Sequence, residues 1–155
     1  MNTLPASIPH ILLVDDNRDG LLVRRALLEE LGYTVEVAEN GEKGLALFQA
    51  SNFDVVVTDY RMPKMNGAEL IARIRQSDPH ARIVLLSGFV EPLGLTSENT
   101  GADSVIAKGA NEPGHLARAV KRLVNAGKRK PPSAQSSARK TARNSGQKRF
   151  RATAG

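Results

Sequence analysis

The feature that most constrains the fold of this chain is the regular alternation, between residues 10 and 126, of short apolar runs with stretches of helical periodicity. Residues 11–14, 55–57 and 83–86 are apolar at every position, which is typical of strands buried on both faces of a parallel sheet. Residues 34–37 alternate polar with apolar, and residues 104–107 are only partly apolar, so both are expected to be edge strands.

The intervening stretches carry helix signals. Val23, Leu27 and Leu31 stand four apart and predict the buried face of the first helix, which Gly32 would end. Helix-capping residues are expected at the starts of three further helices: Asn40, Asn66 with Glu69, and Asn111 to Pro113. Pro92 and Gly94 interrupt residues 91–100, where we expect a short or irregular helix.

A strand followed by a helix, five times over, predicts an α/β fold: a flavodoxin-like (βα)5, doubly wound parallel sheet joined by right-handed crossovers. With the second and fifth strands at the edges, the strand order is expected to be 2-1-3-4-5. In such a sheet, ligands bind in the crevice at the carboxyl ends of the strands.

Charge divides the 155-residue chain into parts. Residues 127–155 hold nine Lys or Arg and no acidic residue, whereas the first 126 residues hold thirteen basic against sixteen acidic residues, a net charge of −3. The polar composition of 127–155 predicts disorder, because little apolar burial could offset the ordering entropy. We therefore expect an N-terminal extension (1–9), one folded domain (10–126) and a basic tail (127–155).

The composition also excludes several classes of protein. There is no cysteine, which rules out disulfides and thiolate metal sites and fits a cytoplasmic location. No apolar run approaches the roughly 20 residues of a transmembrane helix, and the first ten residues lack the features of a secretory signal.

Five polar side chains follow four of the predicted strands: Asp15 and Asp16, then Asp59, Ser87 and Lys108. Each alone has an ordinary explanation as a helix cap, a turn residue or a solvated charge. Together at one sheet edge, the three carboxylates would suit Mg²⁺, which prefers oxygen ligands. The hydroxyl and the ammonium would suit phosphoryl oxygens, and a carboxylate could then act as the nucleophile.

These segments resemble the receiver domain of two-component response regulators over roughly residues 9–126. The resemblance is carried by ILLVDD (11–16), DYRMPKMNG (59–67), LSG (86–88), GAD (101–103) and Lys108. It implies that Asp59 accepts a phosphoryl group from a sensor histidine kinase or a histidine phosphotransfer protein. Asp16, Asp59 and the backbone carbonyl of Arg61 would bind Mg²⁺, with Asp15 assisting. Ser87 and Lys108 would hold the phosphoryl group, so the protein would be a signalling phosphoacceptor rather than an enzyme with a separate substrate.

Two positions depart from the family pattern. Val105 stands where receivers usually have an aromatic switch residue, and Gly109 follows the lysine where they usually have proline. The phosphorylation chemistry is expected to survive both changes, whereas the conformational response must involve another element. Phe89 is one candidate.

Other functions stay open from the sequence. The tail could bind nucleic acid or another anionic partner without sequence specificity, or it could have no partner. A pseudo-receiver would keep the fold and work without phosphate. An aspartyl phosphatase is disfavoured, because Arg61 occupies the position two after Asp59 where a general acid would stand. If the protein dimerises, the resemblance points to the fourth and fifth strand–helix units.

Overall fold

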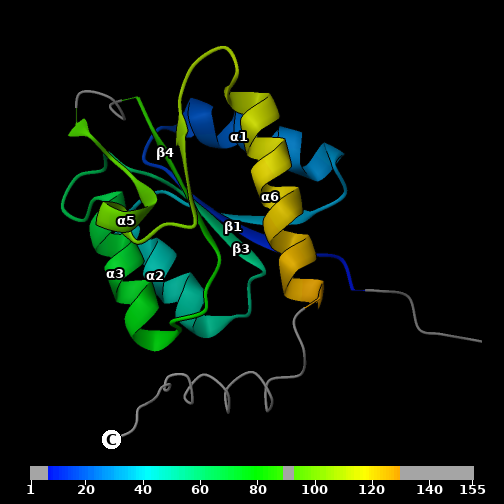
Figure 1. The fold of residues 1–155 in the computed structure, drawn as a ribbon, viewed down its shortest axis with the longest axis horizontal. Helices are drawn as coiled ribbons and strands as arrows, with labels where there is room; N and C mark the ends of the chain where they lie inside the picture. Colours follow the sequence, from blue (N-terminus) through cyan, green and yellow to red (C-terminus); the bar gives the residue numbers. More distant parts are fainter. Residues whose placement is uncertain (1–6, 89–92, 130–155) are drawn as a thin grey trace, which may run out of the picture. The chain divides into compact units, whose positions relative to one another are not determined.

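The computed structural model describes residues 7–88 and 93–129, which form a parallel sheet flanked by helices (Figure 1). The strands are β1 (His10–Val14), β2 (Thr34–Ala38), β3 (Val55–Asp59), β4 (Ile83–Ser87) and β5 (Ser104–Ala107). The helices are α1 (Arg18–Glu30), α2 (Gly41–Ala50), α3 (Gly67–Ser77), α5 (Ser97–Thr100) and α6 (Glu112–Arg129). The predicted alternation of strand and helix is confirmed.

The strand order is β2-β1-β3-β4-β5, with every neighbouring pair parallel, so the predicted flavodoxin-like topology is correct. The register aligns the ends of the central strands: Val14 pairs with Thr58, and Asp59 pairs with Leu86. Because all strands run the same way, their carboxyl ends lie along one edge of the sheet.

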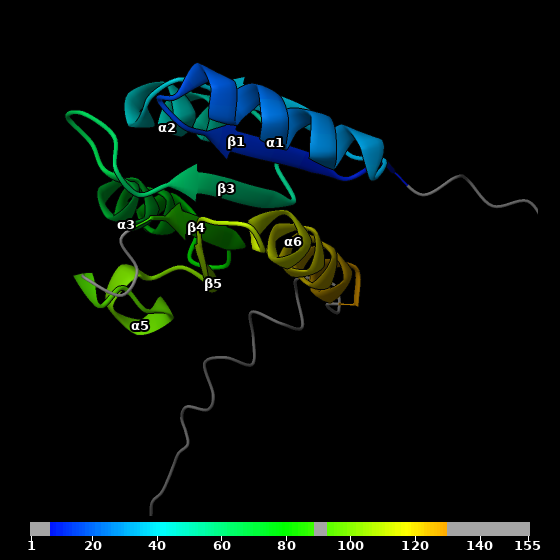
Figure 2. The same ribbon diagram turned by 90° about the horizontal axis from the view of Figure 1, so that it is seen from above.

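Two apolar layers enclose the sheet, one on each face. Ile11 and Leu13 of β1 pack with α1 and with α6 up to Val124. The alternate residues Leu12 and Val14 pack on the other face with α2 and α3. Figure 1 shows these helix pairs on opposite sides of the sheet, and Figure 2 shows α3 and the start of α6 on opposite sides of β4. The strand alternation therefore divides the core between the faces.

The predicted buried face of α1 is wrong at Val23 and Leu31, whereas Leu27 is partly buried and packs against the core. Val23 is 67% exposed and Leu31 is 47% exposed, and the helix instead turns Leu21, Arg24 and Leu28 toward the sheet. These three residues follow the spacing of a buried helix stripe, but the central member carries a charge. Sequence periodicity favoured the apolar set because an arginine is rarely buried without partners.

Two of the predicted helix caps, at α2 and α3, are confirmed. Asn40 accepts a hydrogen bond from the Lys43 amide, and Asn66 and Glu69 form a reciprocal capping box at α3. At α1 the cap is Asn17, whose side chain accepts from the amide of Gly20. The two preceding aspartates therefore do not serve as the α1 cap.

The weakly patterned segment contains the short helix α5, as expected, while residues 89–92, including Phe89, lie outside the described residues. Helix α6 begins at Glu112 and buries Leu116, Val120, Leu123 and Val124, as predicted. It continues to Arg129, past the expected start of the tail. The predictions for residues 130–155 lie outside the described residues.

A close approach fixes the start of α3 against the end of β3. The Gly67 amide donates to the Tyr60 carbonyl at 2.7 Å. A Cβ atom at position 67 would stand 2.4 Å from the Asp59 carbonyl oxygen and 2.9 Å from the Tyr60 Cα. Since backbone atoms cannot yield as a flexible side chain does, only glycine fits here without displacing β3.

We expect Gly67→Ala to lower the free energy of unfolding by about 1–3 kcal/mol, because the methyl group overpacks against backbone. Chemical denaturation measures this. Gly88→Ala is the matched control, since a Cβ there meets nothing within 4 Å. Equal stability of the two variants would contradict this account of the α3 start.

Candidate functional site

The three predicted carboxylates converge at the carboxyl edge of the sheet. Asp15 and Asp16 follow β1, and Asp59 is the last residue of β3. One carboxylate oxygen from each lies within 4.8 Å of the others. Asp15 and Asp59 are buried, whereas Asp16 is exposed. A cavity of about 530 Å³ opens over them, lined also by Arg61, Met62, Pro63 and Lys108. The site is therefore an open acidic pocket.

The predicted lysine and serine reach the same edge. Lys108, directly after β5, places its Nζ 2.5 Å from Asp59 Oδ1. The Lys108 amide donates to the Ser87 carbonyl at 3.0 Å, which fixes the end of β5 beside the end of β4. Ser87 is 1% exposed. The sheet thus brings the carboxylates and the Lys108 ammonium together, and it places Ser87 at the end of the neighbouring strand β4.

Opposing effects set the pKa of Asp59. Burial raises this pKa most, and the neighbouring charge of Asp15 raises it further. The hydrogen bond and the charge of Lys108 lower it, and the charge of Arg24 also lowers it. Burial dominates, so the folded state binds a proton at Asp59 more tightly than the unfolded chain does.

The remaining predicted positions lie around the pocket. Arg61 is exposed and lines its rim. Val105 is half-buried and packs toward α2 and α3, whereas its neighbour Ile106 packs on the α1 and α6 face. Val105 is therefore seated in the core layer rather than in the acidic pocket.

Sequence reasoning missed two charged residues at the site, Arg24 of α1 and Glu112 at the start of α6. Arg24 Nη1 contacts Asp15 Oδ2 at 2.9 Å. Its Nε and Nη2 atoms donate to the two Glu112 carboxylate oxygens at 2.6 and 3.0 Å. The hydrogen bond from Arg24 to Glu112 raises the pKa of Arg24 most, and the charges of Glu112, Asp15 and Asp59 raise it further. Arg24 therefore stays charged despite burial. The sequence signal that could have found Arg24 is its spacing from Leu21 and Leu28, which places the three residues on one face of α1.

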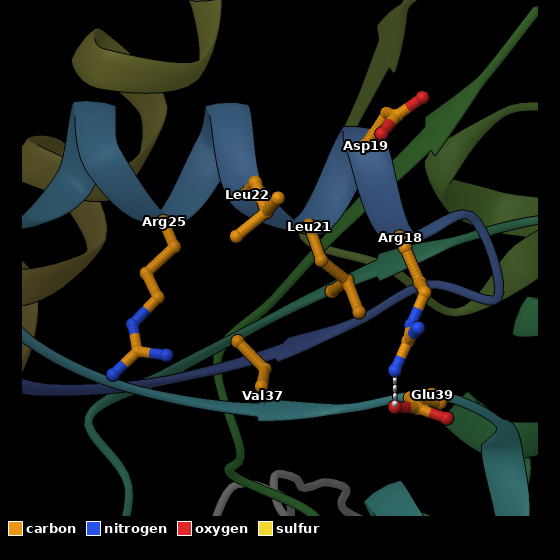
Figure 3. Close-up of a pocket in the computed structure, with 7 residues that line it drawn as sticks. All are labelled: Arg18, Asp19, Leu21, Leu22, Arg25, Val37 and Glu39. Atoms are coloured by element: carbon orange, nitrogen blue, oxygen red, sulfur yellow. Dashed lines mark ion pairs between the residues drawn. The ribbon is translucent and has the colours of Figure 1, made fainter.

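A second hollow lies between α1 and β2 (Figure 3), and it shares no lining residue with the acidic pocket. Its volume is about 400 Å³, and Leu21, Leu22 and Val37 form its apolar part. Arg18 and Glu39 form an exposed ion pair of 3.8 Å at one end. None of the residues that the sequence marked as candidates lines this hollow.

The comparison with protein families bears directly on the acidic pocket. The model of the response regulator receiver domain matches residues 11–121, a span that begins in β1, ends in α6 and contains every carboxylate of the pocket. The chain belongs to the response regulator receiver family. The predicted family is thereby confirmed, and with it the coarse function of a receiver domain in two-component signalling.

Similar proteins agree with this membership. A response regulator receiver protein of an Anaeromyxobacter species is 43% identical over 79 residues, which cover 51% of this chain and 33% of that protein. The gliding motility regulatory protein of Myxococcus xanthus is 35% identical over 120 residues, covering 74% of this chain and 15% of that protein. This receiver chain thus matches a third or less of the length of these relatives.

A solved structure shows the same receiver fold. The Thermotoga maritima response regulator in complex with Mg²⁺ and BeF superposes with a TM-score of 0.69 at 34% identity. The match covers 75% of this chain and 99% of that one. In residues 7–88 and 93–129 of this receiver, no helix has the length and apolar character needed to cross a bilayer.

The raised pKa of Asp59 predicts a pH-dependent stability. Folding stability falls as pH rises from below the unfolded value, 3.8, through the higher folded pKa, because the folded state then holds more protons. Asp59→Asn is expected to raise stability at neutral pH without metal, and this gain should shrink as pH falls toward 3.8.

Urea denaturation across this pH range, in a metal chelator, measures the effect. Asp19→Asn is the control, because Asp19 is exposed in the first turn of α1 and lies outside the carboxylate cluster. A pH-independent gain, or none, in Asp59→Asn would contradict the assignment.

Proposed function

We propose that this receiver accepts a phosphoryl group on Asp59 from a phosphohistidine donor in a phosphorelay, with Mg²⁺, and relays the signal by protein–protein interaction. The observation that carries the proposal is the Lys108 Nζ contact of 2.5 Å with Asp59 inside a cluster of three carboxylates. Lys108 contacts Asp59, the buried carboxylate at the end of β3. A phosphoryl group arriving at Asp59 would therefore meet a cation that can pair with its oxygens.

The donor set fits Mg²⁺. Asp16 and Asp59 would bind it directly with the backbone carbonyl of Arg61, and Asp15 would assist, because hard oxygen ligands are those that Mg²⁺ prefers. When bound, Mg²⁺ would neutralise carboxylate charge and charge developing on phosphoryl oxygens. The related T. maritima response regulator was solved with this ion and BeF, which supports the assignment.

The transfer would proceed by attack of an Asp59 carboxylate oxygen on phosphorus. The new O–P bond forms as the N–P bond to the donor histidine breaks, and the electron pair goes to that imidazole nitrogen. Lys108 would pair with one phosphoryl oxygen, and the Ser87 hydroxyl would donate to another. The protein would in this way catalyse only its own modification and its reversal, as a signalling phosphoacceptor.

The donor would be a sensor histidine kinase or a histidine phosphotransfer protein, and a cytoplasmic location follows from this role as a prediction. The domain boundaries, the anionic partner of the tail, and a dimer through the fourth and fifth strand–helix units also stay predictions. Because Val105 is not aromatic, the conformational response to phosphorylation would depend on other residues.

Phosphorylation at Asp59 can be tested by intact-mass measurement. With Mg²⁺ and acetyl phosphate, we expect one phosphoryl group on the wild type and none on Asp59→Asn. The same donor without Mg²⁺ should give little product. An unmodified wild type, or equal modification of Asp59→Asn, would refute the proposed function.

Metal binding can be tested separately from phosphorylation. Asp16→Asn should weaken Mg²⁺ binding about tenfold or more, because it removes a charged direct ligand. Isothermal titration calorimetry measures the affinity, and Asp19→Asn again serves as the control outside the cluster. Unchanged affinity in Asp16→Asn would remove Asp16 from the proposed ligand set.

A further inference from the structure

Helix α1 carries a buried arginine, Arg24, which pairs with two buried carboxylates. Arg24 is 9% exposed, as is Glu112, and Asp15 is 1% exposed. The Arg24 guanidinium donates hydrogen bonds to both Glu112 carboxylate oxygens and to one Asp15 carboxylate oxygen. A buried charge is costly, and replacing a buried ion pair by apolar residues is often neutral or stabilising. Stability alone therefore gives little reason for an arginine here.

Arg24 holds Asp15 in one orientation. Asp15 Oδ2 accepts from Arg24, and Asp15 Oδ1 accepts from the Asn17 amide at 3.0 Å. The two donors approach different oxygens, so the carboxylate cannot rotate without losing one bond. Because Asp15 belongs to the carboxylate cluster, its orientation affects the pocket.

Glycine at position 20 leaves space for the contact between Arg24 and Asp15. A Cβ atom there would stand 2.6 Å from Arg24 Nη1 and 2.9 Å from Asp15 Oδ2. Glycine inside a helix normally costs about 0.5–1 kcal/mol relative to alanine. A glycine beneath the ion pair is thus a second observation that favours the pair.

Glu112 connects this pair to the segment that carries Lys108. The Glu112 amide donates to the Gly109 carbonyl at 3.1 Å, which closes a tight turn directly after Lys108. Arg24 therefore joins Asp15, on one side of Asp59, to the base of the segment whose lysine contacts Asp59 on the other.

We infer that Arg24 is a positioning residue for the phosphoacceptor pocket: anchored by Glu112, it fixes the Asp15 carboxylate and ties it to the segment that carries Lys108. Arg24 touches Asp15, not Asp59, in this arrangement. The inference rests on the proposed function for its kinetic consequence, whereas its geometric consequence can be measured without phosphate or metal.

The first test replaces Arg24 together with its anchor, Arg24→Met with Glu112→Met, so that the Glu112 carboxylate is not left buried without its partner, while Asp15 keeps its hydrogen bond from the Asn17 amide. We expect the rate constant for Mg²⁺-dependent phosphorylation by acetyl phosphate to fall about tenfold, because small misplacements of reacting groups are costly. Hydrogen exchange of the Asn17 amide should accelerate about tenfold in metal-free protein, because its acceptor is no longer fixed.

The second test keeps every charge. Gly20→Ala places a methyl group against Arg24 and Asp15, and the flexible ends of these side chains can move, so the fold should persist. The same two changes are expected, in the same direction and smaller. The matched control is Arg25→Met with Glu29→Met, an exposed arginine–glutamate pair on the same helix with an Nε–Oε2 distance of 3.0 Å.

Slower phosphorylation and faster Asn17 exchange in both test variants, with an unchanged control, would support the inference. Values within about twofold of wild type in the double variant would overturn it, as would an equal loss in the control. Slower phosphorylation without faster Asn17 exchange would also overturn it, since Arg24 would not then act through Asp15. If the double variant does not fold, Gly20→Ala decides. If wild type takes no phosphoryl group, the proposed function fails and Asn17 exchange alone decides the role of Arg24.

Discussion

Mutual repulsion among carboxylates is the constraint on which the arrangement of this pocket depends. Asp15, Asp16 and Asp59 bring oxygens within 4.8 Å of one another, and two of the three are buried. Like charges at this separation resist joint ionisation. Burial raises the pKa of Asp59 most, and the charge of Asp15 raises it further. Lys108 and Arg24 offset the repulsion from opposite sides, each by a direct contact with one carboxylate.

The parallel sheet brings the three carboxylates together at one edge. Strand register places the end of β3 between the ends of β1 and β4, so residues far apart along the chain meet at one edge. The backbone restricts the residue type at position 67, because the start of α3 approaches Asp59 so closely that only glycine fits there. Asn17 caps α1, which leaves the preceding aspartates to face the pocket.

Val105, one of the two departures from the family pattern, lies in the core of the structure. Val105 is half-buried in the layer against α2 and α3, so the position where receivers usually have an aromatic switch residue carries a small aliphatic side chain packed in the core. On the opposite face, a continuous chain of polar contacts runs from Asp15 through Arg24 to Glu112, the first residue of α6. Charged side chains thus connect the pocket of this receiver to the first residue of α6.

The sequence by itself determined the strands, their order and the caps at Asn40 and Asn66, because strand periodicity and turn chemistry are local and parallel topology follows from alternation. It also predicted that Asp15, Asp16, Asp59 and Lys108 meet at one edge of the sheet, as they do. It misjudged α1, whose buried stripe of Leu21, Arg24 and Leu28 looks less apolar than the exposed stripe through Val23 and Leu31. Only the tertiary structure decided that face. An arginine can be buried when carboxylates meet it there, and these come from residues 15 and 112, which the sequence gives no local reason to bring together.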